Sequence, residues 1–130
     1  MTEVWGKYLW TAMHSFSLVY PIAPTEADKT VAGGYFNNLP IPCGSCAVNY
    51  LQLLQSLPVE PALHSRADLV SWVFEVHNAV NESISKVQFT TDEFIAHYKI
   101  KVSEDGQPQP TMGTRLVGNG VWAYQRLRQG

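Results

Sequence analysis

Apolar residues recur every three to four positions along most of the first hundred residues, and prolines and polar capping residues divide this pattern into segments. The first segment, residues 4–20, is followed by Pro21 and Pro24, which cannot continue a helical hydrogen-bond ladder. The strongest segment, residues 66–86, begins after a Ser65-Arg66-Ala67-Asp68 cap and carries a long apolar stripe. The pattern therefore predicts a long amphipathic helix at each end of this region.

Shorter helices are predicted between and after these two. One covers residues 25–38, where a capping threonine and acidic residues open the first turn, and another runs from about Cys43 to Ser56. A short fifth helix covers about residues 90–98. Because the loops are short and four of the helices have similar lengths, the predicted fold class is all-α, an antiparallel four-helix bundle with a short fifth helix.

The last part of the chain gives a weaker pattern. Residues 103–113 are rich in glycine, proline and polar residues, which predicts a loop. Beyond them, Trp122 and Tyr124 lie among glycines without helical or strand periodicity. We therefore divide the chain into a domain over residues 1–100 and a C-terminal extension of unknown structure over residues 101–130.

The composition of the 130 residues narrows the function classes. The chain is 45% hydrophobic and 15% charged with a formal net charge of −2, which is typical of one globular domain and gives no basic field for nucleic acid or anionic lipid. No apolar run approaches the roughly 20 residues that a membrane helix needs. The first residues lack the basic and apolar regions of a secretory signal. We therefore expect no nucleic-acid or membrane partner.

The only two cysteines, Cys43 and Cys46, form a C-x-x-C at the start of a predicted helix. At a helix N-terminus, unpaired N–H groups and the helix dipole favour a thiolate on the first cysteine. The thiolate is the reactive species in disulfide exchange, and two cysteines at this spacing can close a disulfide. A redox-active dithiol is therefore the favoured interpretation.

Two other interpretations of the C-x-x-C are weaker. A structural zinc site needs four ligands, and the histidines, which are His14, His64, His77 and His97, form no pair at the usual zinc-finger spacing. A thioredoxin-like fold places a buried strand before its C-x-x-C, whereas here the approach is Asn-Asn-Leu-Pro-Ile-Pro. A small helical zinc-binding or protein-interaction module remains the alternative function.

Aromatic and polar residues interrupt the predicted helices at helical spacing. Gly6, Trp10 and His14 are four residues apart on one stripe, and His77 and two asparagines share a patch of the 66–86 helix. Core packing of the aromatic rings and solvent exposure of the asparagines are the simplest explanations. The functional interpretation is a polar surface on this helix that binds a large ligand between helices.

Taken together, these residues resemble the Erv/ALR family of FAD-linked sulfhydryl oxidases. The segment Trp5–His14 resembles the family's G-x-x-x-W-x-x-x-H helix, and Tyr20-Pro21 follows it as in the family. Pro42–Cys46 resembles P-C-x-x-C, and Trp72–Asn81 resembles W-x-x-x-x-H-N-x-V-N. Lys86 follows where the family has a flavin-contacting lysine, and the order agrees over about residues 5–98.

The resemblance implies a FAD-dependent thiol oxidase that converts two thiols and oxygen to a disulfide and hydrogen peroxide, with FAD in the bundle mouth. It implies that Cys46 lies next to the flavin and that Cys43 exchanges disulfides with the substrate. It implies no metal site. The implied FAD contacts are Gly6, Lys7, Trp10, His14, Tyr20, Cys46, His77, Asn78, Val80, Asn81, Lys86 and Tyr98.

The sequence departs from the family in ways that affect the expected partners. Many family members carry a second, shuttle dithiol, for which this sequence has no cysteine. We therefore expect a separate thioredoxin-like or small dithiol carrier to deliver electrons to Cys43. The compact form resembles the members of large DNA viruses, which predicts the host cytoplasm or the virion, with the mitochondrial intermembrane space as the alternative. The family also implies a homodimer. Glu82 and Ser83 stand where the family is often basic.

Overall fold

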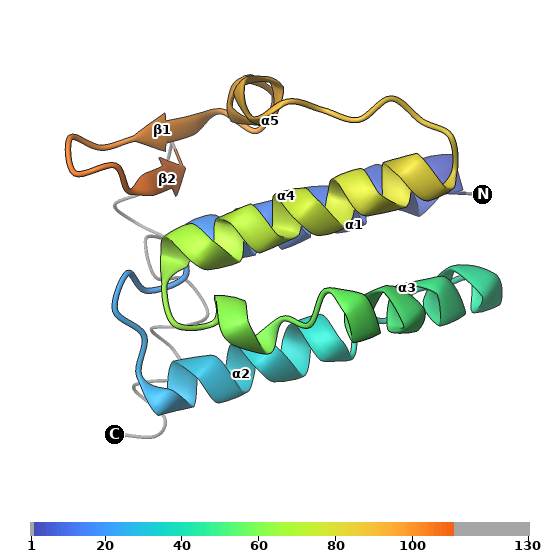
Figure 1. The fold of residues 1–130 in the computed structure, drawn as a ribbon, viewed down its shortest axis with the longest axis horizontal. Coiled ribbons are helices and arrows are strands. Elements are labelled where there is room, and N and C mark those ends of the chain that lie inside the picture. Colours follow the sequence, from blue (N-terminus) through green and yellow to red (C-terminus); the bar gives the residue numbers. More distant parts are fainter. Residues whose placement is uncertain (1, 111–130) are drawn as a thin grey trace.

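The computed structural model describes residues 2–110, in which four helices run alternately in opposite directions as an antiparallel bundle (Figure 1). α1 and α4 lie side by side above α2 and α3 in this view. The four-helix prediction is confirmed, and each helix ends within a few residues of its predicted boundary. The elements are α1 (Thr2–Leu18), α2 (Glu26–Asn37), α3 (Gly44–Ser56), a 3-10 turn (Glu60–Ala62) and α4 (Arg66–Ser83).

Side-chain caps fix where the helices begin. Thr25 and Asp28 form a capping box at α2, in which each side chain accepts a hydrogen bond from the other residue's backbone N–H. Thr90 and Glu93 form a second capping box at α5 (Thr91–His97). At α4 the hydroxyl of Ser65 accepts the Asp68 N–H at 3.2 Å. Each cap satisfies backbone donors that would otherwise lack a partner in the first turn.

Aromatic side chains fill the interior between the four helices. Phe36 is completely buried, and its ring packs edge-on against Tyr35 and Trp72 with centroids 4.9 and 5.4 Å away. Tyr20 is also completely buried, and its hydroxyl donates to the carbonyl of Leu63 at 2.7 Å. These contacts join the turn after α1, helix α2 and the segment before α4 into one core.

A second layer covers α1 and α4, and part of it corrects the sequence-based prediction. It consists of α5 and a hairpin of two antiparallel strands, β1 (Ile100–Val102) and β2 (Pro108–Pro110). The loop predicted over residues 103–113 is wrong where β2 forms. Its two prolines hid the strand because proline lacks an N–H, yet edge positions tolerate proline. The turn uses Gly106 at φ 83°, a left-handed conformation that suits glycine.

Buried contacts attach this hairpin to the bundle. Ile100 packs with Leu18 and Val70 in a second apolar cluster. The Arg66 guanidinium donates to the carbonyls of Tyr20 and Pro108, which joins the start of α4 to the turn after α1 and to β2. The domain boundary after residue 100 stays a prediction, and the predicted tail lies outside the described residues. None of the helices within residues 2–110 is long and apolar enough to cross a membrane.

Candidate redox site

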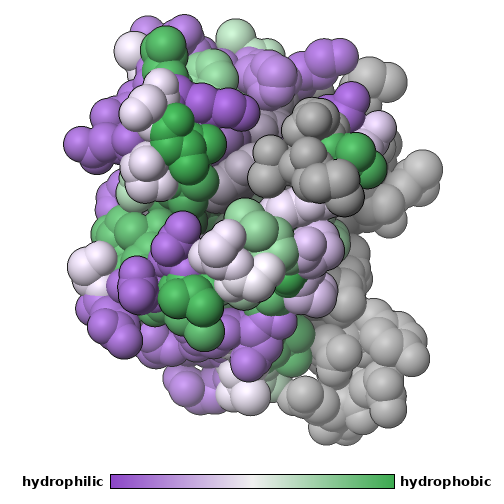
Figure 2. All heavy atoms as spheres, turned by 90° about the vertical axis from the view of Figure 1, so that its right-hand side faces the viewer, coloured by the Kyte–Doolittle hydropathy of each residue, from purple (hydrophilic) through white to green (hydrophobic). Residues whose placement is uncertain are grey.

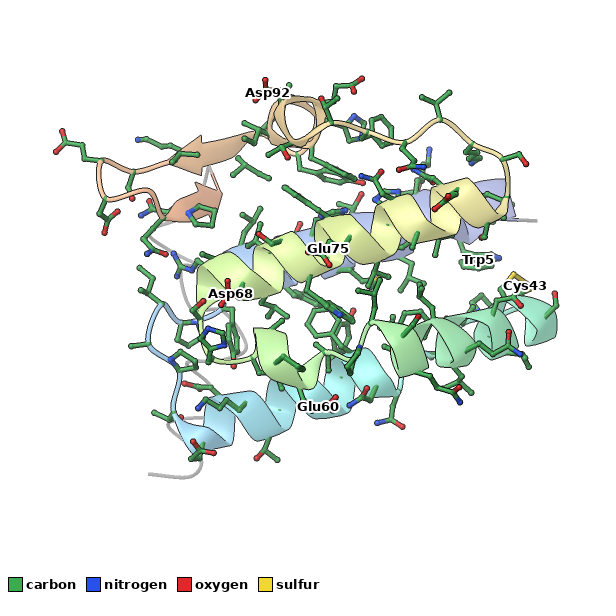
Figure 3. The ribbon with its side chains drawn as sticks, viewed as in Figure 1. Trp5, Cys43, Glu60, Asp68, Glu75 and Asp92 are labelled. Atoms are coloured by element: carbon green, nitrogen blue, oxygen red, sulfur yellow. A yellow bond between two sulfur atoms is a disulfide. The ribbon has the colours of Figure 1, made fainter. Side chains whose placement is uncertain are left out.

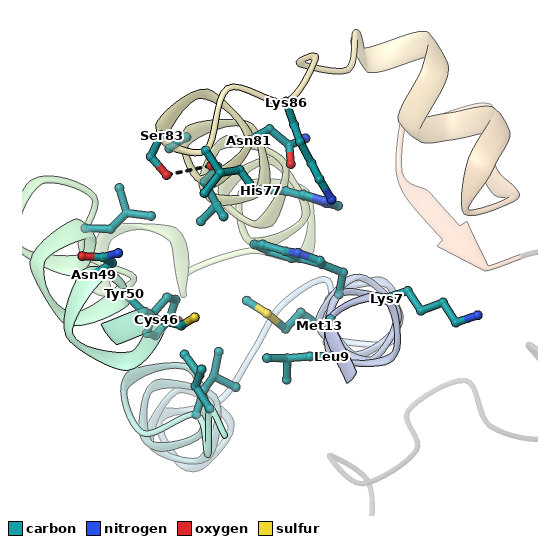
Figure 4. Close-up of a pocket in the computed structure, with 18 of the residues that line it drawn as sticks. Lys7, Leu9, Met13, Cys46, Asn49, Tyr50, His77, Asn81, Ser83 and Lys86 are labelled. Atoms are coloured by element: carbon teal, nitrogen blue, oxygen red, sulfur yellow. Dashed lines mark hydrogen bonds between the residues drawn. The ribbon is translucent and has the colours of Figure 1, made fainter. Parts of the chain in front are cut away.

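A cavity of about 1410 Å³ lies between α1, α3 and α4, at the end of the bundle where α3 begins (Figure 4). Figure 2 faces this end of the molecule and shows hydrophobic residues interspersed among hydrophilic ones. The cavity wall is mostly apolar and contains no aspartate or glutamate among its described residues. The lining residues are Trp5, Gly6, Lys7, Leu9, Trp10, Met13, Leu39, Ile41, Cys46, Asn49, Tyr50, Gln52, Leu53, His77, Ala79, Val80, Asn81, Ser83, Ile84, Lys86, Val87, Phe89, His97 and Tyr98.

Cys43 and Cys46 are joined by a disulfide at the mouth of this cavity (Figure 3). Their Cα atoms are 5.2 Å apart, within the usual range for a disulfide. Cys46 lines the cavity and its sulfur points inward, whereas Cys43 does not belong to the cavity wall (Figure 4). The two sulfur atoms of one bond therefore have different surroundings.

The local sequence explains the position of Cys43. The chain turns tightly at Pro42, where the Cys43 N–H donates to the Ile41 carbonyl at 2.9 Å, and Cys43 itself keeps a β conformation with φ −158° and ψ 118°. Cys43 is the N-cap of α3, and its sulfur accepts the Cys46 N–H at 3.3 Å. Sequence reasoning placed the start of a helix here correctly, and the structure adds that the sulfur itself is the capping group.

Stacked aromatic rings form the wall opposite Cys46. The rings of Trp10 and His77 are parallel, with an interplanar angle of 4° and centroids 3.9 Å apart. Behind them, His14 is 1% exposed and lies 2.9 Å from His77, measured from Nε2 to Nδ1. Tyr98 stacks on the other side of His14 at 4.1 Å. Residues from α1, α4 and the end of α5 thus meet in one aromatic cluster.

Both histidines are neutral at physiological pH. Burial, followed by the repulsion that the rings of His77 and His97 exert when protonated, lowers the pKa of His14 to about 3. Burial, followed by the charges of His97 and Lys86, lowers the pKa of His77 to about 4. Nδ1 of His14 is buried and has no hydrogen-bond partner among the described residues. Because a buried N–H without a partner is costlier than a free acceptor, we assign the His14 proton to Nε2, which donates to His77.

The predicted asparagines hold the segment after α4 against the cavity. Asn78 bonds both backbone groups of Phe89, accepting its N–H and donating to its carbonyl at 2.8 Å each. Asn81 is 5% exposed and donates to the carbonyl of Val87 at 3.4 Å. α4 ends in a Schellman motif, in which Ser85 is left-handed at φ 60° and the Lys86 N–H donates to the Asn81 carbonyl at 2.7 Å. This turn brings Lys86 back to the cavity wall.

The structure brings most of the predicted cofactor contacts together. Nine line the cavity, namely Gly6, Lys7, Trp10, Cys46, His77, Val80, Asn81, Lys86 and Tyr98. The other three lie behind its wall or away from it: His14 supports His77, Asn78 holds the segment after α4, and Tyr20 lies in the core. The contact of each residue with a cofactor stays a prediction.

Sequence reasoning missed the contribution of α3 beyond the cysteines. Asn49, Tyr50 and Leu53 line the cavity three, four and seven positions after Cys46. That spacing places them on the same helical face as Cys46, so the periodicity alone contained the signal. Trp5 was also missed, although it opens the α1 motif, and it lies beside the disulfide end of the bundle (Figure 3).

The structure gives no support to the zinc alternative. Each sulfur of the C-x-x-C is bonded to the other and offers no thiolate to a metal. Within residues 2–110, no group of three or more histidine, cysteine, aspartate or glutamate side chains is arranged to hold a metal ion.

The Erv1/Alr family profile matches residues 7–100, which include the disulfide, the aromatic cluster and every described residue of the cavity wall except Trp5 and Gly6. The chain belongs to the Erv1/Alr family. It is 42% identical over 96 residues to a "probable FAD-linked sulfhydryl oxidase" of Acanthamoeba polyphaga mimivirus, covering 72% of this chain and 67% of the relative. It is 32% identical over 89 residues to the mitochondrial FAD-linked sulfhydryl oxidase ERV1 of Saccharomyces cerevisiae, covering 67% of this chain and 46% of the relative.

The fold of this Erv1/Alr chain also matches that of a solved structure of the family. The crystal structure of the yeast Erv1 core matches with a TM-score of 0.69 at 29% identity, covering 76% of this chain and 84% of that chain. The chain therefore spans the core of that relative, but only about half the length of the full yeast protein.

Proposed function

We propose that this protein is a FAD-dependent thiol oxidase that forms disulfides in a second protein. The observation that carries the proposal is the asymmetry of the Cys43–Cys46 bond, since one sulfur lines a large cavity and the other lies outside it. A bond placed in this way can accept electrons from a thiol on one side and deliver them to a cofactor on the other. Membership of the Erv1/Alr family supports the same chemistry.

The residues of the cavity fit a flavin dinucleotide. The volume of about 1410 Å³ exceeds the roughly 300–1,000 Å³ of ordinary small-molecule pockets, as a dinucleotide requires. Apolar and aromatic side chains suit its flat rings, and Lys86, without an opposing carboxylate in the described wall, suits its diphosphate. The ammonium of Lys7 lies over the ring of Tyr8 and points away from the cavity (Figure 4). Asn49, Asn81 and His77 add hydrogen-bonding groups. When bound, FAD would accept two electrons from the dithiol and pass them to oxygen.

The two cysteines divide the exchange chemistry between them. A substrate thiolate attacks the sulfur of Cys43, the Cys43–Cys46 bond breaks, and Cys46 takes the electron pair as a thiolate inside the cavity. A second substrate thiolate then attacks the substrate sulfur of the mixed disulfide, which releases the oxidised substrate and leaves Cys43 reduced. The stacked rings of Trp10 and His77 line the same cavity as Cys46.

The proposed partners follow from the surface of the protein. Both cysteines of the sequence are used in the disulfide, so a separate dithiol carrier would deliver electrons to Cys43. Val4 and Tyr8 lie one turn apart on α1 and are 65% and 64% exposed, which gives a second copy an apolar strip to cover in a homodimer. For the compartment we propose the host cytoplasm, because one relative is viral, with the mitochondrial intermembrane space as the alternative, because the name of the yeast relative is mitochondrial.

Purified protein tests the proposed activity directly. We expect a yellow protein with one FAD per chain, which consumes oxygen when given a dithiol and releases one hydrogen peroxide for each disulfide formed. The ratio follows because two electrons leave each dithiol and two electrons reduce oxygen to peroxide. An oxygen electrode and a peroxide assay measure it. A colourless protein that contains stoichiometric zinc and does not consume oxygen would overturn the proposal.

A further inference from the structure

A second side chain contacts the sulfur of Cys43 from the first turn of α3. The hydroxyl of Ser45 lies 3.5 Å from Cys43 Sγ. A disulfide sulfur carries no hydrogen, so the Ser45 hydroxyl must be the donor in this contact. The Cys46 N–H donates to the same sulfur at 3.3 Å. Two hydrogen-bond donors therefore converge on one sulfur of the bond.

We propose that Ser45 is a positioning residue that stabilises the thiolate of Cys43 and thereby speeds the release of oxidised substrate. The inference rests on the oxidase function proposed above. The donors are already in place in the disulfide state, so reduction places a negative charge where they point. A hydrogen bond to an ionised acceptor is roughly twice as strong as a neutral one. The hydrogen bond from the Ser45 hydroxyl therefore stabilises the thiolate of reduced Cys43 more than it stabilises the disulfide sulfur.

The step that benefits is the second thiol–disulfide exchange. In the mixed disulfide, one sulfur belongs to the substrate and the other to Cys43. A second substrate thiolate attacks the substrate sulfur, a new bond forms between the two substrate sulfurs, and Cys43 leaves with the electron pair. A leaving thiol with a more stable thiolate leaves faster. In the first exchange, by contrast, accessibility decides which sulfur the substrate thiolate attacks. Cys46 lies in the cavity wall and Cys43 does not, so the attack is on Cys43.

The Ser45 hydroxyl contributes something that the helix terminus alone does not. The Cys46 N–H is a backbone group, so it donates to Cys43 Sγ whatever side chain stands at position 45. The first turn of α3 contains no acidic side chain that would oppose a thiolate. The hydroxyl of Ser45 is therefore the part of this arrangement that a single substitution can remove without changing the backbone or the charge.

The test measures Cys43 alone, in a FAD-loaded Cys46→Ala protein in which Cys43 is the only thiol of the sequence. The rate of alkylation by iodoacetamide is recorded against pH, because only the thiolate reacts. Adding Ser45→Ala should move the midpoint of this profile upward by roughly 0.5 to 1 pH unit. Adding Ser45→Thr, which keeps the hydroxyl, should restore the original midpoint.

Gly44→Ala is the matched control, because a Cβ at position 44 meets no atom within 4 Å and the hydroxyl contact is kept. Its midpoint should equal that of the parent. An unchanged midpoint in Ser45→Ala, or an equal shift in Gly44→Ala, would overturn the proposal. Because the profile reports on Cys43 itself, it gives this answer whether or not the protein oxidises thiols, so a failure here is distinct from a failure of the proposed oxidase activity.

Discussion

Replacing Cys46 with alanine is expected to slow the reduction of the flavin by a dithiol by about 1,000-fold or more. The reason is geometric: Cys46 is the cysteine whose sulfur lines the cavity, and Cys43 Sγ is held outside it by the Cys46 N–H and the Ser45 hydroxyl. With no second sulfur the chain also loses its disulfide, so a substrate thiol has no bond to attack. Stopped-flow absorbance of the FAD-loaded protein without oxygen measures the rate.

Ala47→Ser provides the control for that substitution. Position 47 is next to Cys46 on α3 but does not line the cavity, and the change is a similar alteration of one side-chain atom. FAD content and thermal stability should match the parent in both variants. If Cys46→Ala kept more than about a tenth of the parent rate, electrons would reach the flavin by a route that does not use this sulfur, and the assigned roles would be wrong.

Phe36→Ala is expected to lower the free energy of unfolding by about 3–5 kcal/mol. The ring is completely buried and packs edge-on against Tyr35 and Trp72, and the Phe36 carbonyl on α2 accepts the hydroxyl of Tyr50 on α3 at 2.6 Å. Alanine would leave a cavity that the surrounding aromatic rings cannot close. Because a typical domain is stable by about 5–15 kcal/mol, the loss is large. Urea unfolding with saturating FAD measures it, since bound ligand itself adds stability.

Val48→Ala is the control for the core substitution. Val48 lies on α3 and is 52% exposed, so its truncation should change the free energy of unfolding by no more than about 0.5 kcal/mol. A loss below about 1 kcal/mol in Phe36→Ala would contradict the described packing, because the bundle interior would then tolerate a missing ring.

The helices were predictable from the sequence because their signals are local. Thr25, Ser65 and Thr90 cap the helices that follow them, and the apolar stripe of α4 has one period throughout. The β-hairpin was not predictable in the same way. β1 is three residues long and β2 contains two prolines, and their position depends on contacts of Ile100 with the bundle, far away in sequence.

The candidate site shows the same division between local and long-range information. The C-x-x-C and its helix start were visible in the sequence, but the asymmetry between Cys43 and Cys46 depends on the position of α3 against α1 and α4. The role of the polar surface on α4 was only partly predicted. Asn81 lines the cavity, whereas Asn78 holds the backbone of Phe89, a contact between residues eleven positions apart.

The central claim is that Cys46 faces the flavin and Cys43 faces the substrate, and the absorbance spectra of two single-cysteine proteins test it most directly. In FAD-loaded Cys43→Ala, the Cys46 thiolate should lie against the oxidised flavin and produce a long-wavelength charge-transfer band that disappears as the pH is lowered and the thiolate is protonated. FAD-loaded Cys46→Ala should show no such band at any pH at which the protein is folded. A band in Cys46→Ala and none in Cys43→Ala would contradict the account, because Cys43 would then be the sulfur beside the flavin.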